Sequence, residues 1–115
     1  ETLSDAPGVN DVSIVVRYRL PAGFTSWTNI KLWNMVIQSL GNAAKVTLRL
    51  WDTANVEVVL TGGSNLANTS WTETTITLGA GTFTPDGYVT LRIDLIVGQN
   101  DKARVGEIAL NYTVG

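Results

Sequence analysis

The chain has 115 residues, of which 44% are hydrophobic and 16% are charged, and its formal net charge is -2. This length fits one domain over residues 1–115, and so weak a charge gives no basic field that would attract nucleic acid. The absence of histidine and cysteine excludes imidazole bases, disulfides and histidine or thiolate metal sites.

Apolar side chains recur at every second position along several segments, which is the period of a β-strand with one buried face. The clearest alternation runs through Val12, Ile14, Val16, Tyr18 and Leu20. In chain order, the predicted strands cover residues 12–20, 30–39, 46–50, 56–60, 71–78, 89–97 and 108–112. The pattern therefore predicts seven or eight strands and no helix.

Clusters of Pro, Gly, Asn and Asp separate these strands and favour chain reversals. They lie at residues 7–8, 21–23, 41–42, 52–55, 62–65, 79–81, 85–87 and 98–101. The cluster at 52–55 predicts a tight hairpin. Short strands joined by such turns indicate an all-β fold, an antiparallel β-sandwich of jelly-roll type.

The tryptophans are placed by their phase in the predicted strands. Trp33 shares a face with Met35 and Ile37, so we expect it to be buried. Trp51 is out of phase with the apolar positions of its strand and should point away from the core or cover the hairpin that follows it. We expect Trp27 in a loop and Trp71 at the start of a strand, covering the end of the sandwich.

Catalytic and cofactor chemistry is constrained mainly by what the chain lacks. The glycine clusters open no helix, so no phosphate-binding loop is predicted. Acidic loops at 10–11, 52–55 and 100–101 lack the ligand spacing of a calcium loop. A glycoside hydrolase needs a pair of carboxylates, and several acidic residues are candidates, with Glu73 or Asp94 as an example of one member of such a pair. We predict no catalytic residue, cofactor, metal site or membrane span.

Four segments carry a resemblance to known domains: LPAGFTSW (20–27), NTSWTETTITL (68–78), GTFTPDGYVTLRIDL (81–95) and ARVGEIALNYT (103–113). In this order they resemble the jelly-roll domains of bacteriophage virion proteins, such as capsid decoration proteins and fibre or tail appendages. More distantly, the chain is similar to galactose-binding-like modules. The first resemblance implies a non-enzymatic protein that assembles as a trimer on a virion or another extracellular surface assembly.

Three function classes follow. The leading expectation is a non-catalytic structural domain that self-associates and docks on a larger assembly. Its expected contact residues are Phe24, Trp27, Trp51 and Trp71, with Arg17, Arg19 and Arg49 as a polar rim. The alternative is a carbohydrate-binding module that uses Trp27, Trp51 or Trp71 as a platform for a glycan. A carboxylate-dependent glycoside hydrolase ranks third.

Overall fold

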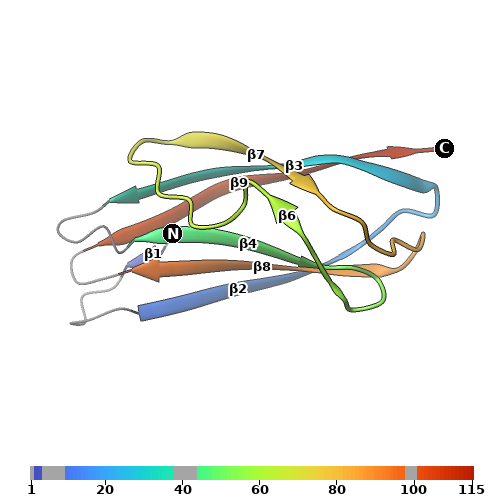
Figure 1. Ribbon diagram of the computed structural model, residues 1–115, viewed down its shortest axis with the longest axis horizontal. Coiled ribbons are helices and arrows are strands. Elements are labelled where there is room, and N and C mark those ends of the chain that lie inside the picture. The colour runs from blue at the N-terminus through green and yellow to red at the C-terminus, as the bar shows by residue number, and fades with distance from the viewer. Residues whose placement is uncertain (1, 4–9, 38–43, 98–100) are drawn as a thin grey trace.

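The structure, a computed structural model, describes residues 2–3, 10–37, 44–97 and 101–115. Within these ranges every regular element is a β-strand, which confirms the predicted fold class. The strands are β1 (Thr2–Leu3), β2 (Asn10–Arg19), β3 (Phe24–Ile37), β4 (Lys45–Trp51), β5 (Glu57–Val58), β6 (Leu60–Thr61), β7 (Thr72–Leu78), β8 (Tyr88–Val97) and β9 (Lys102–Val114) (Figure 1).

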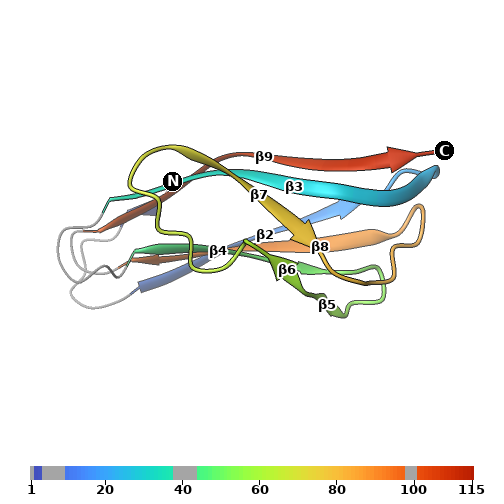
Figure 2. The same cartoon turned by 45° about the horizontal axis from the view of Figure 1, so that its top comes forward.

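Two antiparallel sheets pack face to face as a sandwich (Figures 1 and 2). One sheet, here called the β9 sheet, has the order β1-β9-β3-β7-β6, and the other, the β2 sheet, has the order β2-β8-β4-β5. Strands from the two ends of the chain pair with each other and wrap around the central ones, which is the topology of a jelly roll. The short strands β5 and β6 divide the predicted strand at 56–60 between the two sheets; counted as one, they bring the total to eight.

The core lies between the sheets and is built by the predicted alternation of side chains. In β4 and β8, Val46, Leu48, Leu91, Ile93 and Leu95 are buried on the inner face. Facing them from the β9 sheet are Ile30, Leu32, Val36, Ile76 and Ala103. The period of two therefore placed most inward positions of the β2 sheet correctly.

The turns agree with the sequence where the structure describes them, whereas β3 and β9 each begin six residues earlier than predicted, at Phe24 and Lys102. The reversals at 21–23, 52–55, 62–65, 79–81 and 85–87 all lie between strands. Those at 7–8 and 41–42, and residues 98–100 of the one at 98–101, are outside the described residues. Strand β3 starts at Phe24, so Trp27 lies in a strand and not in a loop. Its pairing with β9 has three register shifts, which let this long strand keep pairing as the sheet bends.

Trp33 is not buried, contrary to the prediction. Its side chain is 37% exposed on the outer face, whereas Leu32 and Asn34 point inward and are fully buried. Both phases of this segment are apolar, and the inward phase contains an asparagine. That amide is tolerated because it is satisfied: Nδ2 donates to Leu32 O at 3.0 Å and to Thr74 Oγ1 at 2.9 Å, and Oδ1 accepts from Asn68 Nδ2 at 2.7 Å.

One long side of the sandwich is closed by the chain itself. The segment after β6 runs beside β4 and β3 and bonds to both sheets. Val46 N donates to Leu66 O at 2.9 Å, and Val36 N donates to Asn68 O at 2.7 Å. Backbone groups at these positions on this side therefore have protein partners.

We predict that Asn34→Leu lowers the free energy of unfolding by about 2 kcal/mol, because it leaves buried carbonyls and the Asn68 amide without partners. Chemical denaturation followed by circular dichroism measures this. The control Met35→Leu, at the neighbouring outward position, should change stability by less than about 1 kcal/mol. Equal stability of the two variants would contradict the structural role of the Asn34 amide.

The predicted hairpin at 52–55 joins β4 to β5 and is built around the Asp52 carboxylate. Oδ1 accepts from Ala54 N and Val56 N, both at 2.9 Å, and Oδ2 accepts from Thr82 N at 2.9 Å. Asn55 has the left-handed φ of 63° that its position in the turn requires. Hydrogen bonds from Thr82 and Val56 lower the pKa of Asp52 despite the partial loss of its hydration.

This lowered pKa predicts a pH dependence of stability. The ionised Asp52 carboxylate stabilises the folded state at pH values above the pKa of an unfolded aspartate, about 4. This stabilisation is lost as the pH falls from that value through the lowered pKa of the folded protein. The Asp52→Asn variant should therefore be less stable than the wild type at about pH 6, and the difference should narrow toward about pH 3. Thermal melts of both proteins across this range test it, and a constant difference would contradict the assignment.

Candidate interaction surface

The side of the sandwich opposite the closed one has two strand edges that the described residues leave without a strand partner. Strand β2 pairs with β8 along its whole length and with no other described strand. Strand β9 pairs with β1 only at Lys102 and Ala103. We call the edge of β2, together with the edge of β9 from Arg104 to Val114, the open side.

An apolar groove runs between the sheets along the open side. Its volume is about 320 Å³. The lining side chains come from β2 (Val16 and Tyr18), from β8 (Leu91 and Ile93) and from β9 (Ile108 and Leu110). All of them lie on the inner faces of the two sheets, so the groove is an uncovered margin of the core.

Two tyrosines join the sheets beside this groove. The hydroxyl groups of Tyr18 on β2 and Tyr112 on β9 lie 2.6 Å apart, and the ring centroids are 6.3 Å apart. The hydrogen bond to Tyr112, together with burial, raises the pKa of Tyr18. The Tyr18 phenol therefore remains neutral over the physiological pH range and keeps its hydrogen bond to Tyr112.

The middle of the β2 edge is apolar on both faces. Val16 points toward the groove and is 49% exposed, and Val15 points to the outer face and is 59% exposed. Residues 12–16 carry no charge. Natural edge strands are usually protected by charges, bulges, proline or a covering segment. Among the described residues, this part of β2 has none of these.

Arg17 and Arg19, two of the predicted rim residues, lie at the C-terminal end of the same edge. The Arg17 guanidinium lies 4.8 Å from the centroid of the Tyr88 ring. Arg19 forms an exposed ion pair with Asp86 at 3.2 Å. The structure therefore places both arginines beside the open side, whose groove is lined by none of the aromatic residues around which a polar rim was predicted.

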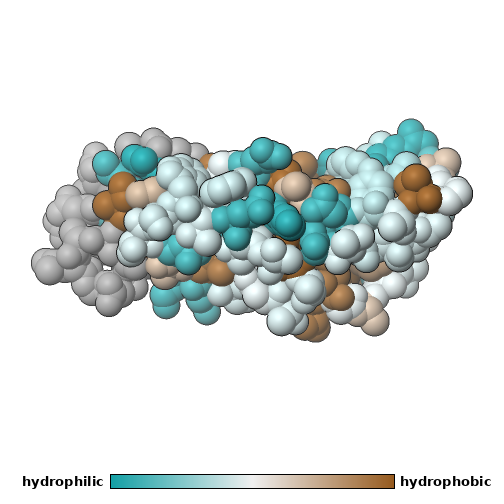
Figure 3. Space-filling view, turned by 90° about the horizontal axis from the view of Figure 1, so that it is seen from above, coloured by the Kyte–Doolittle hydropathy of each residue, from teal (hydrophilic) through white to brown (hydrophobic). Residues whose placement is uncertain are grey.

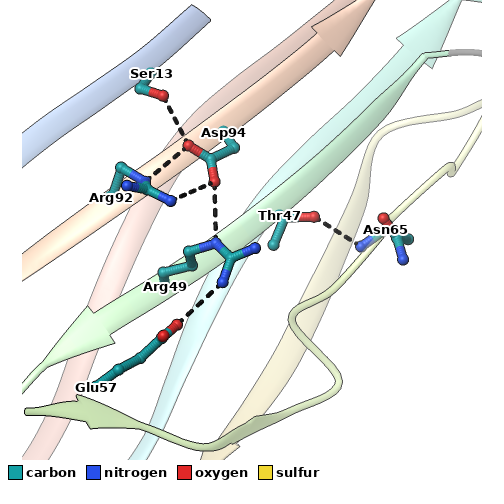
Figure 4. Close-up of polar contacts among 7 residues, drawn as sticks. All are labelled: Ser13, Thr47, Arg49, Glu57, Asn65, Arg92 and Asp94. Atoms are coloured by element: carbon teal, nitrogen blue, oxygen red, sulfur yellow. Dashed lines mark hydrogen bonds and ion pairs between the residues drawn. The ribbon is translucent and has the colours of Figure 1, made fainter. Parts of the chain in front are cut away.

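Arg49, the third predicted rim residue, belongs to a polar network on the outer face of the β2 sheet (Figure 4). It donates to Asp94 at 3.2 Å and to Glu57 at 3.1 Å. Asp94 also accepts from Ser13 Oγ at 2.8 Å and forms an ion pair with Arg92 at 3.0 Å. Partial burial alone would raise the pKa of Asp94, but the bonds from Ser13 and Arg49 and the charge of Arg92 outweigh it and lower that pKa.

Glu73 and Asp94, the two acids named for glycoside hydrolysis, lie on opposite faces of the sandwich, and each forms ion pairs with basic side chains. Asp94 lies on the outer face of the β2 sheet, whereas Glu73 lies on β7 in the other sheet and is 3.9 Å from Lys31 Nζ. The whole thickness of the sandwich separates them. In addition, Asp94 is held in its ionised form by its neighbours, which is unfavourable for a general acid.

The predicted aromatic contact residues are distributed over three places. Trp51 points away from the core, as expected, and the Arg92 guanidinium lies 5.1 Å from the centroid of its ring. Phe24 is only 6% exposed and therefore belongs to the core, which corrects its assignment to a contact surface. It packs with half-buried Trp27, Phe83 and Tyr112 in an aromatic cluster, with ring centroids 5.4 to 6.2 Å from Phe24.

Trp71 lies on the outer face of the β9 sheet, where it meets Trp33 around Gly106. A Cβ atom at Gly106 would lie 3.4 Å from Cβ of Trp33 and 3.5 Å from Cζ3 of Trp71. Trp71 is 47% exposed. Figure 3 shows this face of the molecule, over β7, β3 and β9, as mostly white and teal with separate brown patches. The two rings therefore sit on a largely polar face.

The described residues contain no group of three or more Asp or Glu side chains placed to hold a metal ion. Of the loops weighed for calcium, 52–55 has its aspartate occupied by three backbone N–H groups. Residue 100 and the side chains of residues 10 and 11 are outside what the structure describes. In the same described ranges, no helix has the length and apolar character needed to span a bilayer.

Sequence reasoning missed the groove because the inward residues of β2 look like ordinary core residues. One signal was present: Val15 interrupts the polar phase of β2, so that Ile14, Val15 and Val16 form an apolar run. Comparisons with protein-family models, with curated proteins and with solved structures found no match to this chain. The geometry of the open side is therefore the basis for the proposal that follows.

Proposed function

We propose that this protein is a non-catalytic structural domain that acts by self-association and by docking on a larger assembly. The observation that carries the proposal is the open side, where an uncharged, exposed strand edge borders an apolar groove. An unpaired edge offers backbone donors and acceptors, and the groove offers apolar area that is stabilised when water is excluded. Together they form a surface suited to another polypeptide.

The contrast between the two sides of the sandwich supports this proposal. On the closed side, the segment after β6 donates and accepts backbone hydrogen bonds with β4 and β3. On the open side, Val15 and Val16 project from β2 with more than half and about half of their surface exposed, at 59% and 49%. Apolar edges of this kind are typical of interaction sites, because they attract further strands.

The resemblance of four segments to bacteriophage virion domains suggests the setting. We propose a virion or another extracellular particle surface as the larger assembly, with identical copies of the chain as the first partners. Closed symmetric assemblies are the usual outcome when a domain recognises its own surface. The trimer that the resemblance implies is one such assembly.

Self-association predicts that the solution mass increases with protein concentration above the monomer mass of 12.4 kDa. Sedimentation equilibrium over a concentration series measures this. Val16→Asp should weaken the association by roughly 100-fold or more, because a charge without a partner would be buried in the contact. Its fold should be unchanged by circular dichroism, since Val16 is about half exposed, at 49%.

The matched control is Val59→Asp. Val59 is 74% exposed and lies between β5 and β6, on the opposite side of the sandwich. This variant should associate like the wild type. A wild-type chain that stays monomeric at every concentration, or a Val59→Asp effect as large as that of Val16→Asp, would overturn the proposal.

A carbohydrate-binding role is the second candidate, because Trp33 and Trp71 flank Gly106 on a polar face. Exposed indole rings can stack on the apolar face of a pyranose, and nearby polar groups such as Lys31 and Glu73 can bond to its hydroxyls. Trp51 is less suited, since Arg92 already covers one side of its ring. Trp27 is half-buried in the aromatic cluster.

Glycan binding predicts a saturable change in tryptophan fluorescence when soluble pyranose oligosaccharides are added. Trp71→Ala should reduce the affinity by roughly 10-fold or more, the loss expected for one stacked ring. Trp51→Ala, on the other sheet, is the control and should bind as the wild type does. The absence of any saturable change across a glycan panel would rule out this candidate.

A further inference from the structure

We propose that two copies of the chain pair through β2, antiparallel and around a two-fold axis at Val15, so that the two β2 sheets form one continuous sheet. This inference rests on the proposed self-association and specifies its geometry. Such an arrangement is isologous, because the same strand is used by both copies, and it gives a closed dimer in place of the trimer that the resemblance implies.

The sequence of β2 is symmetric about Val15 in the pattern of its apolar side chains. In an antiparallel pair centred there, Val12 lies opposite Tyr18 and Ile14 lies opposite Val16 of the second copy. All four residues alternate on the inner face of the sheet. Each inward apolar side chain would thus meet another apolar side chain, and Val16 would be covered by Ile14 of the second copy.

The charged side chains of β2 are also placed compatibly in this pair. In this register Arg17 lies opposite Ser13 of the second copy, and Arg19 lies opposite position 11, an aspartate in the sequence. Ser13 is next to Asp94 on β8, to which its Oγ donates at 2.8 Å. Arg17 would therefore lie opposite a small neutral side chain, and Arg19 opposite an acidic residue. No arginine faces an arginine.

Neighbouring registers are less favourable. Moving the axis to Ile14 places Tyr18 opposite Asn10 and leaves the largest inward side chain without an apolar partner. If the axis moves to Val16, Arg17 faces Val15 and Arg19 faces Ser13 of the second copy, so neither arginine lies opposite an acidic residue. An axis at Arg17 brings two guanidinium groups together, and like charges directly opposite each other destabilise a sheet. Pairing centred on Val15 avoids all three conflicts.

The occupant is a second copy because the edge is self-complementary in this way. A strand of unrelated sequence would have to match four apolar inward positions and supply acidic or neutral groups opposite two arginines. β2 itself meets these requirements. Pairing also satisfies backbone donors and acceptors along the full edge, which side-chain packing in the groove alone would not do.

Disulfide trapping tests the register cleanly, because the chain contains no cysteine. In the two-fold pair, residue 15 of one copy lies opposite residue 15 of the other copy. Their Cα atoms are then about 4.5 to 5.5 Å apart, a distance that a disulfide can bridge. Val15→Cys should therefore form a covalent dimer on mild oxidation. At micromolar protein we expect a rate on the order of 100-fold above that of the control Val59→Cys, because pairing raises the local thiol concentration.

The ease of forming a disulfide at residue 15 depends on whether the central pair is hydrogen-bonded or not, because the two types of pair differ in Cα distance. A second cross-link at other positions removes this dependence. Positions 14 and 16 face each other in the dimer and form the alternate type of pair. An equimolar mixture of Ile14→Cys and Val16→Cys should then give mixed dimers, while each variant oxidised alone should give few. At least one of the two experiments must trap a dimer if the register is correct.

The outcomes separate this inference from the function on which it rests. If the wild-type mass increases with concentration but neither cross-link forms above the Val59→Cys control, the β2 pairing is wrong and self-association stands. A wild-type trimer without β2 cross-links leads to the same conclusion. If the wild type is monomeric at all concentrations, both proposals fail. Rapid trapping of both dimers, with unchanged circular dichroism, supports the two-fold pairing.

Discussion

Backbone N–H and C=O groups along an edge strand need water, a side chain or another strand as a partner, and in this protein that requirement applies to the whole free edge of β2. The jelly-roll winding is the cause. Strands from the chain ends pair as β1 with β9 and β2 with β8, which places β2 at the margin of its sheet. The neighbouring edge of β9 is also open among the described strands, because β1 pairs with β9 only at Lys102 and Ala103.

The two long sides of the sandwich thus differ in how the backbone groups of their edge strands find partners. On the closed side, the chain crosses between sheets at β5 and β6 and then runs back across β4 and β3, supplying backbone bonds and the Asn68 amide that satisfies Asn34. On the open side, the link between the sheets consists of side chains, with the Tyr18–Tyr112 hydrogen bond beside an apolar groove. Local chain connectivity therefore determines which side remains available to a partner.

The fold was largely predictable from sequence, because alternation of side chains is a local property that each strand carries by itself. Failures occurred where a distant residue decides the outcome. Asn34 is buried only because Asn68 and Thr74 complete its hydrogen bonds, and this inward polar residue shifted the predicted face of Trp33. For the same reason the open side could not be predicted from the sequence. Val16 has the spacing of a core residue, and its exposure depends on which strand lies next to β2.

The charges on the outer face of the β2 sheet make this face less suited to a partner than the edge of β2. The side chains of these ion pairs are 17–61% exposed, so the pairs contribute little to stability. They do balance the charges of this face, because Arg49 lies between Glu57 and Asp94, and Arg19 pairs with Asp86. A face whose charges are already paired gains little from binding a charged partner. The apolar centre of β2 has no such internal partner. The proposed association is therefore favoured along the strand edge over the sheet face. An edge contact would extend the sheet, whereas a face contact would only stack two sheets.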